Sequence, residues 1–256
     1  MDLGKGLTGK RILITGASSG LGAHFAKVAA RHGAHVALAA RRTDRLEQLA
    51  GELVEMGAPS ARPIELDVSD GASIHHCRAQ AVEAFGGLDI LVNNAGIARE
   101  GPALDQTAED FDAVMDVNLR GVWLMAISCG RHWRDTGQSG VIVNIASILG
   151  LRVGSGVASY AVSKAGVVQM TKALALEFAR HDVRVNALAP GYFETEINEG
   201  FFDTPAGEKM VSRVPMRRIG DLSELDAPFL LLASDASRYM TGAVIPVDGG
   251  HLVSSL

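Results

Sequence analysis

Short runs of β-branched and other apolar residues recur along the chain, separated by longer stretches of mixed polarity. Most runs are continuous rather than alternating, a pattern typical of strands that are buried on both faces. We therefore expect strands at 11–15, 35–40, 62–67, 88–93, 140–145, 183–188 and 242–247. The intervening stretches are long enough for helices, which we expect at 20–32, 43–57, 70–85, 107–134, 159–181 and 221–234.

Strands that alternate with helices indicate βαβ units, and hence a mainly parallel sheet with helices on both sides. Right-handed crossovers then wind the chain both ways, which predicts an α/β, Rossmann-like, doubly wound sheet of seven strands. With 256 residues and 47% hydrophobic content, one domain over 1–256 is the better expectation than two.

Two segments show no clear element. The stretch 190–215 is the longest, and a loop of this length in a compact domain is usually functional or mobile. We expect it to be a mobile substrate loop. The polar stretch "RHWRDTGQSG", residues 131–140, is interpreted as a surface loop without a function.

Composition excludes several classes of function. The net charge of -5 is scattered, so neither a nucleic-acid partner nor a disordered acidic tail is expected. No run of about 18 apolar residues predicts a membrane span, and the start lacks the apolar core of a secretory signal. Cys77 and Cys129 are widely separated, which favours a reducing, cytoplasmic setting. The histidines lack metal-ligand spacing, so no metal site is expected.

The first predicted strand runs into "TGASSGLG", residues 15–22, with glycines at 16, 20 and 22. Glycines let a backbone turn tightly and approach a pyrophosphate, and the following helix offers free N–H groups. Any strand-to-helix turn can use one glycine, but three at this spacing favour a dinucleotide cradle. Its expected cofactor contacts are Gly16, Ser18, Ser19, Gly20, Leu21 and Gly22.

The end of the second strand reads "LAARRTDRL" and bears on which dinucleotide binds. Ala40 stands where an acid would hold the ribose 2′-hydroxyl of NAD. Arg41 and Arg42 follow just before a helix N-terminus, an unfavourable place for cations that a bound 2′-phosphate would make favourable. We favour phosphate contact for Arg41. For Arg42, phosphate contact and simple solvation remain equal alternatives. The prediction is NADP(H), with NAD(H) as the alternative.

Tyr160 and Lys164 stand four residues apart in a predicted helix, so they share a face. A free phenol has a pKa of about 10, and a nearby cation favours the phenolate. A tyrosine that exchanges protons near neutral pH needs such help. Taken alone, the pair is more often a surface feature.

Taken together, the motifs resemble those of the short-chain dehydrogenase/reductase family. They are "TGASSGLG", "NNAG" (93–96), Asn118, Ser147, "YAVSK" (160–164) and "PG" (190–191), in the family's order and approximate spacing. The resemblance runs from residue 9 to about 250, and the combination is far more specific than any one motif.

The resemblance implies four catalytic residues. Tyr160 would be the general acid/base, and Lys164 would lower the pKa of Tyr160 and bind the nicotinamide ribose. Ser147 would hydrogen-bond the substrate oxygen, although a turn cap is its alternative role. Asn118 would help to order a water for proton relay through its backbone, and a purely structural role is its alternative.

The resemblance also implies further cofactor contacts, which are Asp67, Val68, Asn94, Ala95, Gly96, Pro190, Gly191 and Thr195. Asp67 could equally be the N-cap of the next helix. The family further implies a homotetramer that uses two long helices of each subunit.

Apolar residues near the expected nicotinamide site favour a small, apolar ketone or secondary alcohol. The expected substrate contacts are Ser147, Leu149, Phe193, Phe201 and Phe202, with Ile197 nearby. Glu194, Glu196 and Glu199 in the same loop would repel an anionic substrate. The leading hypothesis is an NADP(H)-dependent oxidoreductase acting on such compounds. The alternatives are a 3-oxoacyl-carrier-protein or coenzyme-A thioester reductase and a non-catalytic NADP sensor.

Overall fold

The computed structural model describes residues 4–196, 198 and 200–254. The strands are Arg11–Thr15 (β1), His35–Ala40 (β2), Ala61–Glu65 (β3), Ile90–Asn93 (β4), Gly140–Ile145 (β5), Val183–Pro190 (β6) and Val244–Val247 (β7). The α-helices are Gly20–Arg31 (α1), Thr43–Glu55 (α2), Gly71–Phe85 (α3), Ala108–Met115 (α4), Gly121–Thr136 (α5), Ala158–Phe178 (α6), Pro205–Val211 (α7) and Asp226–Ala233 (α8). Most predicted elements are therefore confirmed to within a few residues.

All seven strands form one parallel sheet in the order β3-β2-β1-β4-β5-β6-β7. The chain winds outward from β1 to β3 and then crosses back to place β4 beside β1. The doubly wound prediction is confirmed. The winding direction reverses between β1 and β4, and ligands of such sheets bind beyond the carboxyl ends of the strands at that point.

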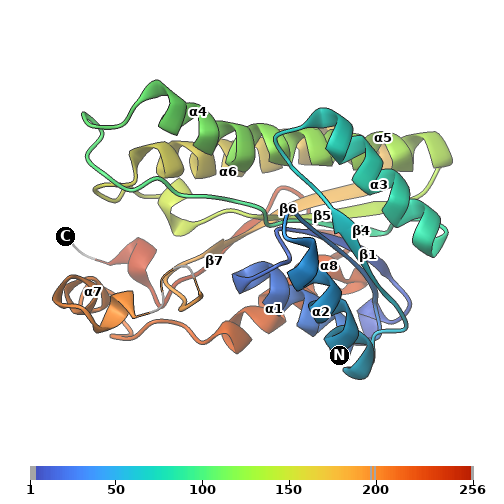
Figure 1. Cartoon of the computed structure of the whole chain (residues 1–256), viewed down its shortest axis with the longest axis horizontal. Coiled ribbons are helices and arrows are strands. Elements are labelled where there is room, and N and C mark those ends of the chain that lie inside the picture. Colours follow the sequence, from blue (N-terminus) through green and yellow to red (C-terminus); the bar gives the residue numbers. More distant parts are fainter. Residues whose placement is uncertain (1–3, 197, 199, 255–256) are drawn as a thin grey trace.

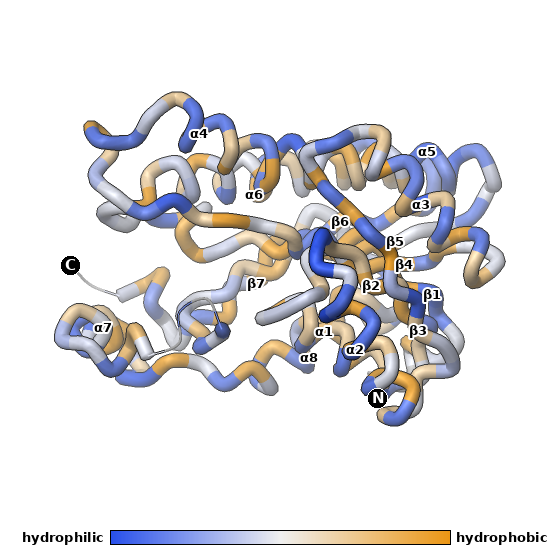
Figure 2. Tube along the Cα trace, in the orientation of Figure 1, coloured by the Kyte–Doolittle hydropathy of each residue, from blue (hydrophilic) through white to orange (hydrophobic). Residues whose placement is uncertain are grey.

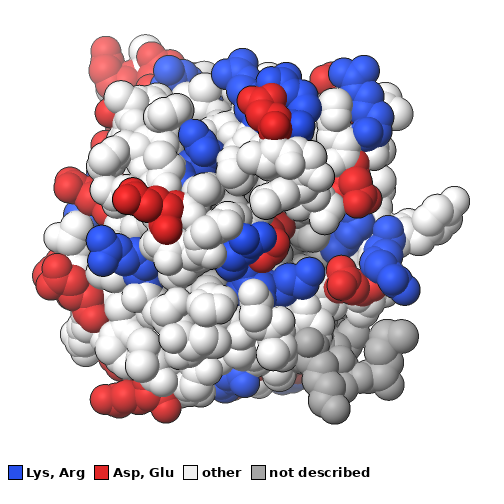
Figure 3. Space-filling model, turned by 90° about the vertical axis from the view of Figure 1, so that its right-hand side faces the viewer, with Lys and Arg blue, Asp and Glu red and all other residues white. Residues whose placement is uncertain are grey.

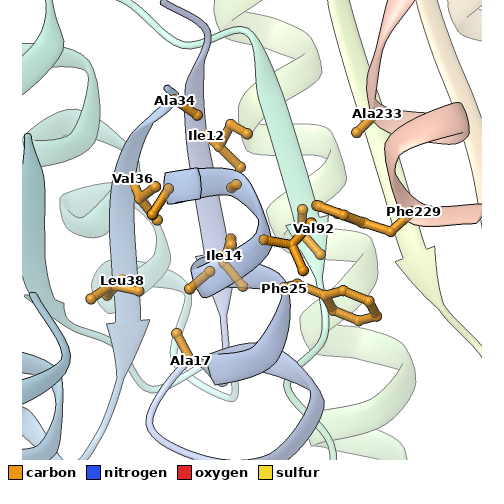
Figure 4. Packing of buried hydrophobic residues seen from close by; sticks show 14 of the residues in the cluster. Ile12, Ile14, Ala17, Phe25, Ala34, Val36, Leu38, Val92, Phe229 and Ala233 are labelled. Carbon is orange, nitrogen blue, oxygen red and sulfur yellow. The ribbon is translucent and has the colours of Figure 1, made fainter. Parts of the chain in front are cut away.

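Helices cover both faces of the sheet, and each face has its own hydrophobic core. Helices α1, α2 and α8 lie on one side, and α3, α4, α5 and α6 lie on the other (Figure 1). The rings of Phe25 and Phe229 stack with centroids 4.7 Å apart and join α1 to α8 over the sheet (Figure 4). Hydrophobic residues concentrate in the central strands, and hydrophilic ones occupy much of the outer helices (Figure 2).

Residues 131–140 are not the surface loop that the sequence suggested. Helix α5 continues to Thr136, and Trp133 is fully buried in its last turn. The Trp133 indole donates a 2.7 Å hydrogen bond to the backbone oxygen of Leu88. Trp133 is a single apolar residue among polar neighbours, so the sequence does not reveal that its side chain points inward. The ring packs against Gly140 at the start of β5.

The stretch 190–215 also contains more regular structure than expected. A short 3-10 helix, Phe201–Asp203 (η5), leads into α7, which the sequence analysis did not predict. Thr204 caps α7 by accepting a hydrogen bond from Gly207 N, and Pro205 occupies the first turn. A helix of seven residues is too short to leave a clear periodic pattern. Ile197 and Glu199 of this stretch lie outside the described residues.

Acidic and basic side chains are interspersed across the face shown in Figure 3. Among the described residues, no helix is long and apolar enough to span a bilayer. The same part of the chain contains no cluster of three or more His, Cys, Asp or Glu side chains with metal-binding geometry.

Candidate active site

The turn between β1 and α1 is packed against the end of β4. A Cβ on Gly16 would lie 2.7 Å from Ala95 Cα, and a Cβ on Gly22 would lie 2.5 Å from Asn94 Nδ2. Gly16 also has a φ of 66°, in the left-handed region that favours glycine. These two glycines are therefore required by close packing inside the protein.

Hydrogen bonds join this turn to the "NNAG" segment. Asn94 Nδ2 donates to the backbone oxygens of Thr15 at 3.0 Å and Gly16 at 3.2 Å. In return, Thr15 Oγ1 accepts from the backbone N–H groups of Asn94 and Ala95, both at 3.0 Å. Two motifs about 80 residues apart in sequence thus form one surface at the topological switch point of the sheet.

Arg42 reaches the turn, whereas Arg41 does not. The Arg42 guanidinium donates to Ser18 Oγ at 2.9 Å and to Ser19 Oγ at 2.8 Å. Arg41 is exposed and lies on the side of Asp67, whose pKa it helps to lower. The sequence favours Arg41 for phosphate contact, whereas in the structure Ser18 and Ser19 contact Arg42.

Asp67 is not the N-cap of α3. That position belongs to Asp70, which accepts hydrogen bonds from Ala72 N and Ser73 N. Asp67 accepts instead from the Ser69 hydroxyl and backbone N–H, and these bonds lower the pKa of its carboxyl group. Val68 is buried and packs closely against Gly121 at the start of α5.

Tyr160, Lys164 and Ser147 meet where β5 ends and α6 begins. Lys164 Nζ lies 5.6 Å from the centroid of the Tyr160 ring, and it donates a 2.8 Å hydrogen bond to the backbone oxygen of Ile145. Ser147 Oγ accepts from Leu149 N at 3.1 Å and also hydrogen-bonds with Tyr160. Ser147 therefore caps a 3-10 helix, Ile148–Gly150 (η3), and contacts the phenol at the same time.

The protonation of this group differs from the sequence expectation. Burial raises the pKa of Tyr160, and the hydrogen bond with Ser147 opposes that rise. Lys164 is only 4% exposed, and burial lowers the pKa of its ammonium group to about 8. In the protein by itself, the pKa of Tyr160 therefore lies above its ordinary value, and burial is the largest cause.

Asn118 lies in a π-helical turn, Asp116–Arg120 (η2), between α4 and α5. Its amide pairs with the backbone of Ile97, accepting from N and donating to O at 2.8 Å each, and it also donates to Ser163 Oγ at 3.1 Å. Such wide turns are frequent at functional sites. The Asn118 side chain thus holds the segment after β4 against α6. The Asn118 backbone forms part of the π-helical turn.

A chain of hydrogen-bonded, buried polar side chains joins the strands and the helix that carry the site. The sequence does not predict these connections. Asn93 Nδ2 donates to Asn144 Oδ1, and Asn144 Nδ2 donates to Thr171 Oγ1, each at 3.0 Å. All three residues are at most 2% exposed. The chain links β4, β5 and α6. Asn93 is the first residue of the "NNAG" motif, and the sequence signal for Asn144 is an asparagine inside an apolar strand.

Several predicted contacts lie near the ends of β6 and β7. Pro190 is the last residue of β6, and Gly191 packs against Asp248. The Thr195 side chain lies 3.7 Å from the position of a Cβ on Gly20, so the 190–215 stretch lies against the β1–α1 turn. Gly96 faces Asn118 and Lys164.

The predicted substrate residues are not equivalent. Phe193 is 6% exposed, and its ring fills the space that a side chain at Gly220 would need. Phe202 is 8% exposed, whereas Phe201 and Leu149 are partly open. Glu196 is neutralised by Arg45 at 2.7 Å, which weakens the predicted repulsion of anions.

Three further residues, none of them predicted, lie beside these aromatic rings. Tyr192 follows Gly191 directly, and its ring lies 5.3 Å from that of His251 and 6.2 Å from that of Phe202. Arg152, five residues after Ser147, donates to the backbone oxygen of His251. Their only sequence signal is their position shortly after strand ends.

Comparison with known proteins gives whole-length matches. A family model described as Enoyl-(Acyl carrier protein) reductase matches residues 16–251. The chain is 40% identical to the 3-oxoacyl-[acyl-carrier-protein] reductase FabG of Thermotoga maritima, covering 96% of this chain and 99% of that protein. It is 41% identical to a short-chain type dehydrogenase/reductase from Mycobacterium marinum, with a TM-score of 0.91 over 96% and 97% of the two chains. A gluconate 5-dehydrogenase from Burkholderia cenocepacia, solved with NADP and tartrate, is 35% identical with a TM-score of 0.93 over both complete chains.

Proposed function

We propose that this chain, which belongs to the short-chain dehydrogenase/reductase family, interconverts a ketone and a secondary alcohol with NADP(H) as its cofactor. Membership makes it an oxidoreductase acting on CH–OH groups. The observation that carries the proposal is the meeting of Tyr160, Lys164 and Ser147 at the carboxyl end of β5, on the same edge of the sheet as the glycine turn.

The glycine turn fits the pyrophosphate of a dinucleotide. Ser19 is the N-cap of α1 but makes no side-chain cap, so the first N–H groups of the helix are not satisfied by it. At Gly20, the Thr195 side chain is the one described neighbour within 4 Å of a Cβ position. An uncapped helix N-terminus behind an open glycine is a suitable anion site.

Arg42 supports NADP(H) over NAD(H). Its guanidinium is held at the turn by Ser18 and Ser19, and β2 ends on alanine rather than on an acid. A fixed guanidinium beside a helix N-terminus suits a 2′-phosphate. The related gluconate 5-dehydrogenase was solved with NADP, which agrees with this preference.

In this proposal the residues of the site have distinct tasks. A bound nicotinamide supplies or accepts the hydride. Tyr160 gives its phenolic proton to the carbonyl oxygen during reduction and takes the hydroxyl proton during oxidation. Ser147 orients the substrate oxygen by hydrogen bonding, and Lys164 holds the ribose hydroxyls from its buried position. Asn118 keeps the segment after β4 in place and orders a water with its backbone.

A second candidate is reduction of 3-oxoacyl thioesters, because the Thermotoga relative at 40% identity is named as such a reductase. The two candidates differ in the substrate carrier rather than in the chemistry at the carbonyl. A panel that contains both acetoacetyl-coenzyme A and simple ketones separates them by kcat/KM.

The test of the main proposal is a Tyr160→Phe variant assayed by NADPH absorbance with a panel of ketones and secondary alcohols. We expect kcat to fall by about a hundredfold or more, the usual contribution of a general acid. NADPH binding, followed by its fluorescence, should stay near the wild-type affinity. Unchanged turnover in Tyr160→Phe would show that another group exchanges the proton.

We further propose a homotetramer in the cytoplasm. Helices α5 and α6 contact each other on one face of the sheet (Figure 1), and they carry the exposed apolar side chains Trp123, Val162 and Leu176. Exposed apolar groups gathered on neighbouring helices favour association. The cytoplasmic setting is supported by Cys77 and Cys129, which are both buried and free.

A further inference from the structure

Three neighbouring strands, β5, β6 and β7, end at the same edge of the sheet as the candidate active site. Ser147 follows β5, Tyr192 follows β6, and His251 follows β7 in a 3-10 helix, His251–Val253 (η8). Figure 1 shows this C-terminal turn on the side of the molecule that also holds α7 and the start of α6. Because the carboxyl ends of parallel strands meet at one edge of the sheet, these groups lie on the same edge as Tyr160.

Tyr192, His251 and Arg152 form a polar cluster at this place. The His251 side chain is 5% exposed, and its Nδ1 is buried without a hydrogen-bond partner among the described residues. Arg152 is half-buried and is tied to the C-terminal turn through the backbone oxygen of His251 and through Ser254 Oγ, the latter at 3.3 Å. Within the part of the chain that the structure describes, no carboxylate forms an ion pair with Arg152.

Asp248 is the acid that acts on His251, and its single charge offsets only part of the positive charge of Arg152 and Arg213. It accepts from Gly250 N at 2.9 Å and from Leu252 N at 2.6 Å, so both of its oxygens hold the turn around His251. Arg213, just after α7, adds a second positive charge that acts on both Tyr192 and His251. Burial lowers the pKa of His251, and Arg152 lowers it further, as expected where positive charge is in excess.

We propose that Arg152, together with Tyr192 and His251, binds the carboxylate of an oxo acid or hydroxy acid substrate. The inference rests on the proposed oxidoreductase function and names its substrate class. A half-buried guanidinium and a phenol offer the donors that a carboxylate prefers, and the carboxylate would supply the charge balance that the cluster lacks. The expected apolar ketone is thereby replaced by a compound with one anionic end.

The test compares substrates that differ only in this charge. Acetoacetate and methyl acetoacetate are reduced with NADPH, and D-gluconate and D-gluconamide are oxidised with NADP. Wild type should prefer the carboxylate of at least one pair by roughly tenfold or more in kcat/KM, the scale of one charge-assisted hydrogen bond. Arg152→Met should abolish this preference by raising KM, and Arg152→Lys should restore part of it.

Two controls separate binding from folding. Arg134→Met removes an exposed arginine from the last turn of α5 and should keep the preference. His251→Phe preserves the ring that packs against Tyr192 and should weaken the preference. A wild type that uses both members of each pair equally well would overturn the carboxylate site and leave the oxidoreductase proposal standing.

A binding measurement decides the matter if no compound turns over. Malonate is added to the protein at constant ionic strength, with chloride as the reference, and thermal unfolding is followed. Stabilisation by malonate in wild type and not in Arg152→Met would support the carboxylate site even though the proposed reaction had failed. No stabilisation and no turnover would overturn both.

Discussion

Arg41 and Arg42 are adjacent in the chain but have different surroundings. Arg42 precedes the first turn of α2 and extends across to the serines of the β1–α1 turn, at 2.8 and 2.9 Å. Arg41 acts instead on Asp67, which follows β3. Which of two neighbouring side chains meets a phosphate depends on the direction in which each leaves the backbone.

We expect Arg42→Ala to raise the KM for NADP by about tenfold to a hundredfold, because one charge-assisted contact is lost. The KM for NAD should change little, since NAD carries no 2′-phosphate. Initial rates with NADP and with NAD give the ratio of the two KM values. Arg41→Ala is the matched control, and a larger loss of NADP preference in that variant would reverse the assignment.

The titration of Tyr160 predicts opposite pH profiles for the two directions of the reaction. Because its folded pKa is raised, the phenol keeps its proton through neutral pH, so kcat/KM for ketone reduction should be flat there and fall only in alkaline solution. Alcohol oxidation needs the phenolate, so its kcat/KM should rise from about pH 7 and still be rising at about pH 10. Oxidation that is already independent of pH at neutrality would mean that the phenol pKa is lowered in the free enzyme.

At the scale of elements, the site depends on the fit between the β1–α1 turn and the segment after β4. Gly22 lies at this contact, and a Cβ on it would be 2.3 Å from the backbone oxygen of Gly16. A neighbour made of backbone cannot rotate away. The turn can therefore accept no side chain at Gly22 without moving the Asn94 amide that holds it.

We expect Gly22→Ala to lower the free energy of unfolding by about 1–3 kcal/mol, as overpacking of a tight site does. Cofactor affinity should fall with it. Gly51 offers the matched control, because it lies inside α2 with no described neighbour within 4 Å of a Cβ. Gly51→Ala should raise stability by about 0.5–1 kcal/mol. Urea denaturation of both variants checks the contrast.

At the scale of the whole molecule, the sheet is enclosed by helices on both faces, yet one helical layer still exposes apolar side chains. Trp123 is 44% exposed on α5, and Leu176 is 83% exposed on α6. On the opposite face, Val54 of α2 is 53% exposed, and α2 carries no second large apolar side chain that is exposed. Of these two surfaces, the α5–α6 layer exposes more large apolar side chains, which is why we propose it as the subunit interface.

We expect Trp123→Glu to reduce the molar mass measured by light scattering, because a buried, unpaired carboxylate is costly in an apolar interface. Val54→Glu should leave the mass of the assembly unchanged. A wild-type protein that elutes as a monomer would show that these side chains are simply solvated.

The sequence by itself determined the order of strands and helices along the chain, the doubly wound sheet, and the motifs that meet at its carboxyl edge. Continuous apolar runs and glycine spacing are local patterns, so they can be recognised in the sequence alone. It did not predict the seven-residue α7 or the buried Trp133, because one short helix and one inward residue leave too little periodicity.

Only the tertiary structure decided which charged and aromatic side chains come together. It placed Arg42 rather than Arg41 at the cradle serines, packed Phe193 against Gly220, and assembled Arg152, Tyr192 and His251 from three strand ends. Such contacts join residues up to about a hundred positions apart, for example Arg152 and His251. Their geometry follows from how the elements pack, which no local pattern of residues encodes.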